Sequence, residues 1–157
     1  MRFIDASEDR WQTVCDQLVP PTGPVLFTLE QWASHRDAWP RDRAAGVSLP
    51  NTADVEALGA DVQRWALIVL QFPKWTDGRA YSQARLLRTR LRFGGEVRAA
   101  GDALVDMLPL LQRSGFDAVQ LRSDQSVSAA QRALRFFAGH YQGDVTERRP
   151  LFARPQS

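Results

Sequence analysis

The stretch Trp65-Ala66-Leu67-Ile68-Val69-Leu70-Gln71-Phe72 is apolar along almost its whole length. A strand with one face in water alternates apolar and polar residues, and this stretch does not alternate. Apolarity that is broken only at Gln71 over eight residues is typical of a strand covered on both faces, as in the centre of a parallel sheet. The stretch therefore predicts an α/β protein organised around residues 65–72.

The sequence after this strand repeats a strand-and-helix pattern. Apolar residues at helical spacing predict a helix over 79–92, and Gly94-Gly95 ends it. The following segments are strand 96–100, helix 103–114 opened by Asp102, strand 116–121 and helix 126–138. Pro109 lies inside the predicted helix 103–114, where it costs about 3 kcal/mol unless the helix is kinked or split. Three such units predict a right-handed parallel βαβ array, either an open sheet or a partial barrel.

The sequence before residue 65 carries weaker signals of the same kind. Residues 25–28 and 47–49 read as short strands, and 29–38 and roughly 53–64 as helices, the latter capped by Asn51 or Thr52. We expect one α/β domain over 1–141. Residues 142–157 have no apolar period and are expected to form a surface tail.

Length and composition limit the possible architectures. A chain of 157 residues builds one compact core and is too short for a complete eight-fold barrel. The single cysteine, Cys15, excludes an intramolecular disulfide and a Cys-rich zinc site. No apolar run approaches the length of a membrane span or of a signal-peptide core with its flank, so we expect a cytoplasmic protein without membrane partners.

Charge is concentrated in one segment. Residues 74–98 hold seven basic and two acidic side chains, whereas residues 1–73 are net acidic. Nucleic-acid binding usually needs a broader basic face, so no nucleic-acid partner is expected. Within the basic segment, Arg85, Arg88 and Arg92 fall on one helix face, either as a solvated stripe or as a surface for an acidic partner.

The loop after strand 65–72 is the first place to look for chemistry, because ligands of parallel sheets bind beyond the carboxyl ends of the strands. The loop and the following helix start supply a capping group, a glycine, positive charge at a helix N-terminus and two hydroxyls. These candidate residues for a ligand or a partner are Lys74, Trp75, Thr76, Asp77, Gly78, Arg79, Tyr81 and Ser82. The structural alternative is that Asp77 only caps the helix and pairs with Arg79. Trp75 either stacks on a partner or folds back onto the core.

Arg98 and Asp102 extend this candidate site. Arg98 lies near the end of the next strand and Asp102 at the start of the next helix, so both are candidates to project toward the same edge as Arg79. Glu96 shares a strand face with Arg98, and a simple ion pair between them is the favoured alternative.

Other chemical signals are missing from the sequence. His35 and His140 have no metal-binding partners at ligand spacing, and no nucleophile elbow, dinucleotide-binding motif or P-loop occurs. Cys15 has no nearby basic residue to activate it. We predict no metal and no cofactor, and the residues alone name no catalytic group.

Four ordered motifs carry a family resemblance. The sequence resembles the bacterial domain of unknown function 934 family over about residues 45–122. The resemblance rests on FPKWTDGRAYS at 72–82, ARLLR at 84–88, GEVRAAGD at 95–102 and RSGFD at 113–117. The genes of that family typically neighbour the assimilatory sulfite reductase hemoprotein, and some members are labelled oxidoreductases. Trp75 stands where phenylalanine is usual. Ser114 replaces a family cysteine, which argues against a redox role for that position here.

The resemblance and the basic loop together lead us to expect a non-catalytic accessory protein of sulfate and sulfite assimilation. Such a protein would bind a small oxyanion, or would dock on the sulfite reductase hemoprotein or on another protein of that pathway. The alternative is a small enzyme that acts on an anionic metabolite through Asp77, Arg79 and Arg98. A flavin or nucleotide binder is the third hypothesis, disfavoured by the missing phosphate loop.

Overall fold

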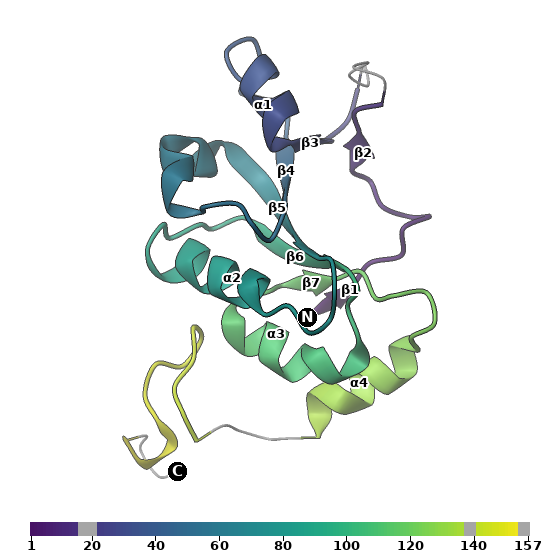
Figure 1. Cartoon of the computed structure of the whole chain (residues 1–157), viewed down its shortest axis with the longest axis vertical. Helices are drawn as coiled ribbons and strands as arrows, with labels where there is room; N and C mark the ends of the chain where they lie inside the picture. Colours follow the sequence, from purple (N-terminus) through teal and green to yellow (C-terminus); the bar gives the residue numbers. More distant parts are fainter. Residues whose placement is uncertain (16–21, 137–140, 154–157) are drawn as a thin grey trace.

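A computed structural model describes residues 1–15, 22–136 and 141–153. Seven strands form one sheet in the order β1-β7-β6-β5-β4-β3-β2, and every neighbouring pair is parallel. Strands that follow one another in the chain are neighbours from β2 to β7, so the sheet is singly wound. It curves into an open half-barrel with β1 and β2 as its two edges (Figure 1). The predicted α/β class and parallel sheet are confirmed, and the sheet is the open, partly barrel-like form.

The strands are Arg2–Phe3 (β1), Gln12–Thr13 (β2), Val25–Thr28 (β3), Ala45–Leu49 (β4), Trp65–Phe72 (β5), Glu96–Gly101 (β6) and Ala118–Val119 (β7). β5 pairs with β4 and β6 along most of its length, as expected for a central strand. The predicted strand 116–121 is shorter, because only Ala118 and Val119 pair with β6.

The helices follow β3 to β7. They are α1 (Leu29–His35), the 3-10 segment η1 (Glu56–Arg64), α2 (Arg79–Thr89), η2 (Val105–Met107), α3 (Leu108–Ser114) and α4 (Val127–Arg135), with a last 3-10 turn η3 (Leu151–Ala153). The expectation of a regular helix over 53–64 was wrong: η1 is a 3-10 segment interrupted at Gly59. The last two residues of the predicted helix 126–138 lie outside the described residues.

Pro109 explains the division of the predicted helix 103–114. The chain forms η2 first and α3 afterwards, with Pro109 in the first turn of α3, where its missing N–H breaks no helical hydrogen bond. Gly115 ends α3 with a φ of 103°, a left-handed conformation that a glycine adopts without a steric penalty.

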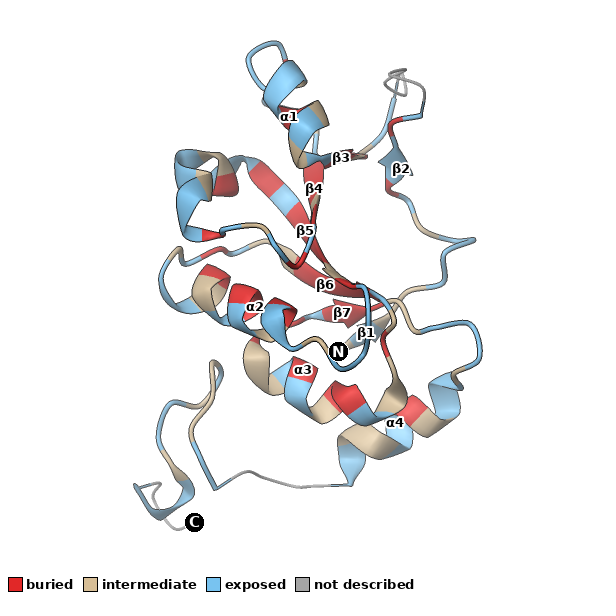
Figure 2. Cartoon of the chain, viewed as in Figure 1, coloured by how far each residue is buried: buried red, intermediate tan, exposed pale blue. Residues whose placement is uncertain are grey.

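Both faces of β5 are covered, as the sequence predicted, but by different means. Ile68, Leu70 and Phe72 belong to the large core between the sheet and the helices (Figure 2). On the concave face, Leu67 and Val69 pack with Trp11, a residue of the segment that connects the two sheet edges. The buried Trp11 indole therefore covers β5 on the concave side of the sheet.

The segment 141–153 lies against the end of α3. The backbone N–H of Val145 donates to the carbonyl of Arg113 at 3.4 Å, and Asp144 pairs with the Arg113 guanidinium at 4.0 Å. The described part of the predicted tail is thus attached to the domain surface, beside the C-terminal end of the helix.

Candidate carboxyl-edge site

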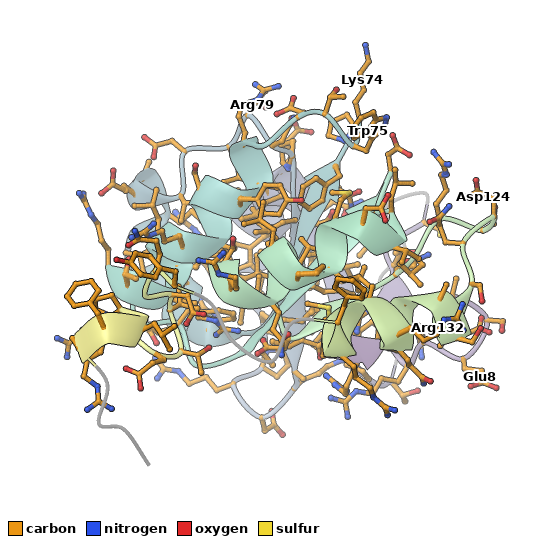
Figure 3. The ribbon with its side chains drawn as sticks, turned by 90° about the horizontal axis from the view of Figure 1, so that it is seen from below. Glu8, Lys74, Trp75, Arg79, Asp124 and Arg132 are labelled. Carbon is orange, nitrogen blue, oxygen red and sulfur yellow. The ribbon has the colours of Figure 1, made fainter. Side chains whose placement is uncertain are left out.

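The loop between β5 and α2 projects from the carboxyl edge of the sheet. In Figure 3, Lys74 and Arg79 point outward from this edge, and Trp75 lies beside Lys74. Thr76 and Gly78 are exposed as well. Trp75 keeps 55% of its surface accessible, so its indole does not fold back onto the core. The structure therefore brings the basic and aromatic residues of the predicted loop together on one exposed rim.

Asp77 organises the start of α2. Its carboxylate accepts hydrogen bonds from the Arg79 guanidinium, at 3.0 Å from Nε and 2.6 Å from Nη2, and from the Arg79 backbone N–H at 3.2 Å. The buried Asn51 amide donates at 2.7 Å to Oδ2 of Asp77, the same oxygen that accepts Arg79 Nη2. Hydrogen bonds from Arg79 and Asn51 lower the pKa of Asp77 to about 2.

The predicted cap of α2 is different in detail. Gly78 is the N-cap residue, and no side chain caps that position. Thr76 makes no contribution there, whereas Asp77 receives the N–H of Arg79, the first helical residue. The structural alternative proposed for Asp77 and Arg79 is thus observed, although the Arg79 side chain stays 57% exposed to water.

The side chains of Tyr81 and Ser82 lie in different environments. The Tyr81 ring packs edge to face on Phe72, with centroids 5.2 Å apart, and also approaches Phe116. Burial raises the pKa of the Tyr81 phenol. Ser82 is exposed on the helix. Tyr81 therefore belongs mainly to the rim of the core.

Asp102 connects the loop to the neighbouring βα connection. One carboxylate oxygen accepts the backbone N–H of Trp75 at 2.8 Å, and the other accepts Arg122 Nη1 at 2.7 Å. Arg122 also forms a two-point pair with Asp124, at 2.6 and 2.7 Å. These contacts lower the pKa values of Asp102 and Asp124, the latter to about 2. They leave both acids ionised and hold the Trp75 backbone in place.

Arg98 does not join this group. It lies on the concave face, level with Val69 and Ala118 of the adjacent strands, and is 3% exposed. Its guanidinium pairs with Glu96 at 3.0 Å and with Asp9, and Glu96 also pairs with Arg2. The favoured alternative, a pair with Glu96, is confirmed. The expectation that Arg98 projects toward Arg79 was wrong, because Arg98 lies three residues before Gly101, the last residue of the strand, and its side chain is buried on the concave face.

The sequence reasoning also missed the role of Arg88. Only 18% of its side chain is exposed, and it donates to the carbonyls of Phe93, Gly95 and Gly115 and pairs with Asp117. The proposed stripe of three arginines is therefore not a uniform surface, since Arg88 ties α2 to the loops before β6 and β7.

A cavity of about 640 Å³ lies beside the loop site, at the carboxyl ends of β1, β6 and β7. Its wall includes Phe3, Asp5, Gly101, Gln120 and Arg122. The sequence signal for it was present, because Arg122, Ser123 and Asp124 form a polar run directly after the predicted strand 116–121. The rule that selected residues 73–79 applies equally to this run.

No group of three or more His, Cys, Asp or Glu side chains within residues 1–15, 22–136 and 141–153 is arranged to hold a metal ion. Across the same ranges, every helix is too short or too polar to span a bilayer.

Comparison with known proteins gives one result. A search of curated proteins found no match to this sequence. The sequence model of the family described as "bacterial protein of unknown function (DUF934)" matches residues 46–152, which extends through β4 to η3 and includes the whole 73–82 loop. The chain belongs to this DUF934 family of bacterial proteins.

Proposed function

We propose that this protein is a cytoplasmic, non-catalytic accessory factor of sulfate and sulfite assimilation, and that it docks on a protein of that pathway through the loop 73–82. The observation that carries the proposal is the exposed Trp75 indole, flanked by Lys74 and Arg79 on a loop with a fixed backbone. Tryptophan and arginine are enriched among the residues that dominate protein interfaces.

The loop has little conformational freedom to lose on binding. Asp102 holds the N–H of Trp75, the N–H of Asp77 donates to the Lys74 carbonyl at 3.0 Å, and Asp77 itself is held by Asn51. A surface that is already ordered binds without paying for loop ordering.

The same contacts favour a protein partner over a small oxyanion. The Asp77 carboxylate already accepts hydrogen bonds from Nε and Nη2 of Arg79, the two nitrogens that would otherwise bind an oxyanion together. Lys74 forms no ion pair with any described residue. The loop is therefore complementary to an acidic protein surface that contacts Lys74 and covers the Trp75 indole.

The pathway assignment rests on the family. This protein resembles the DUF934 proteins over the loop, and the genes of that family typically neighbour the gene of the sulfite reductase hemoprotein. We propose this hemoprotein as the first partner to test. The alternative enzyme would need Asp77, Arg79 and Arg98 at one place, and Arg98 lies on the concave face instead.

The test combines growth with purification. In a bacterium that encodes this protein, we expect deletion of the gene to slow growth on sulfate and not on cysteine, and the wild-type gene to restore it. Trp75→Ala combined with Lys74→Glu should fail to restore growth. Phe152→Ala, which removes a 73% exposed ring remote in sequence from the loop, is the matched control and should restore it.

Affinity purification from cells grown on sulfate supplies the second readout. A siroheme protein should copurify with the wild type and with Phe152→Ala, and should be lost with the loop variant. Equal growth of the deletion strain on sulfate and on cysteine would remove the proposed role.

A further inference from the structure

We infer that the cavity at the carboxyl ends of β1, β6 and β7 binds a small organic cation, an ammonium group attached to an apolar body. The inference does not depend on the proposed function of the loop, because it concerns a different set of side chains. At about 640 Å³, the cavity has the size of a small-molecule site.

One part of the cavity wall is apolar. Phe3 and Ile4 come from the end of β1, Leu121 from the end of β7 and Val127 from the first turn of α4. Phe3, Ile4 and Leu121 are partly buried, and Val127 is 47% exposed. An apolar ligand body would remove these side chains from water, which is favourable by the hydrophobic effect.

The charged side chains of the wall, counted together with their ion-pair partners, are net negative. Among the described residues, Arg122 is the only cation in the wall. It pairs with Asp102 and Asp124, which are not themselves lining residues. Asp5 also lines the cavity, and its carboxylate accepts only the N–H and the hydroxyl of Ser7, at 2.8 and 2.7 Å. Asp5, together with Arg122 and its two acidic partners, gives three carboxylates against one guanidinium, and Asp5 has no cationic partner among the described residues.

The N-terminus of α4 opposes this charge only in part. A helix N-terminus carries the equivalent of about half a positive charge. Ser126 already accepts the N–H of Ala129 at 3.4 Å, which satisfies one of the free donors there. The potential in the cavity therefore stays negative, and an ammonium group beside Asp5 is favoured over a carboxylate or a phosphate.

Gln120 provides a further polar contact. It follows β7 directly and lines the cavity, and its carboxamide forms no hydrogen bond with the described part of the chain. The amide oxygen can accept a second hydrogen bond from the ammonium group, since such a group has three donors. The site then has an anion, a neutral acceptor and an apolar wall, which together match an amine.

The experiment uses three probes of similar shape: benzylamine, benzyl alcohol and benzoate. Each is titrated into the full-length ¹⁵N-labelled protein, and the amide shifts of residues 120–127 report binding. We expect benzylamine to bind roughly tenfold or more tightly than either other probe, because a charge-assisted hydrogen bond to Asp5 provides a gain in affinity of about that size. Asp5→Asn should remove that advantage and leave benzyl alcohol unchanged, because asparagine still accepts from Ser7.

Three further variants complete the design. Asp42→Asn makes the same charge change at an exposed position between α1 and β4, and should leave all three affinities unchanged. Val127→Trp fills the cavity mouth from an exposed position and should abolish binding of every probe, even if Asp5→Asn fails to fold. Trp75→Ala should not alter benzylamine binding, which separates this site from the docking loop.

Three outcomes would overturn the inference. Tighter binding of benzoate would reassign the cavity to anions held by Arg122 and α4. Equal binding of the three probes would show an apolar cavity without charge selection. The absence of shifts at the solubility limit of all three would show that the cavity binds none of them.

Discussion

The carboxylate of Asp102 accepts the backbone N–H of Trp75 at 2.8 Å across 27 positions of sequence, and so joins the connection after β6 to the loop after β5. The same carboxylate accepts Arg122 from the connection after β7. Three successive loops of the carboxyl edge are thus tied at one side chain, which lies between the proposed docking loop and the proposed cavity.

Asp102→Ala should loosen the docking loop without unfolding the domain. The Trp75 amide loses its acceptor, so its hydrogen exchange should accelerate by about tenfold or more, whereas the amides of β5 should keep their protection. Asp102→Asn keeps one carbonyl oxygen and should show a smaller acceleration. Unchanged exchange at Trp75 in the alanine variant would show that the loop is ordered by other contacts.

Acid should weaken the fold through Asp77. Its pKa is about 2 in the folded protein, against an ordinary value of 3.8. A lowered folded-state pKa contributes stability that is complete above about pH 4 and is lost as the pH falls toward 2. Urea unfolding across this range should therefore show a shallower loss of stability in Asp77→Asn than in the wild type. Asp42→Asn serves as the control and should follow the wild-type curve.

Arg88→Met should destabilise the protein by about 1–3 kcal/mol, because it removes the donor of three backbone carbonyls and the cationic partner of Asp117, whose carboxylate keeps the N–H of Val97. Arg85→Met, on an exposed face of the same helix, should change the free energy of unfolding by less than about 0.5 kcal/mol. Chemical denaturation measures both. Equal effects of the two substitutions would contradict the structural role of Arg88.

Gly101→Ala should cost about 1–3 kcal/mol through backbone strain alone, since the φ of Gly101 is 94°. An added Cβ would also lie 2.5 Å from the Phe72 carbonyl oxygen, which already accepts the N–H of Asp102. Gly94→Ala is the matched control, because a Cβ there meets nothing within 4 Å. Thermal unfolding should separate the two variants, and a neutral Gly101→Ala would refute the strain argument.

Much of the α/β array could be predicted from sequence because its signals are local. The apolar run 65–72 marked the central strand, and helix periods with Gly115 and Pro109 marked how the later helices end and divide. The Asp77–Arg79 and Glu96–Arg98 pairs were also predictable, because their members are two residues apart in one loop and in one strand.

The rest depended on contacts between segments that are distant in sequence. β1 and β2 are two residues long and show no period, so they exist only because β7 and β3 offer them backbone partners. Sequence alone could not show that Trp11 covers the concave face, that Asp9 draws Arg98 inward, or that Arg122 meets Asp102. The sequence by itself determined a parallel α/β array with an exposed basic loop. Only the tertiary structure decided which charges neutralise one another, because that depends on distances the chain acquires when it folds.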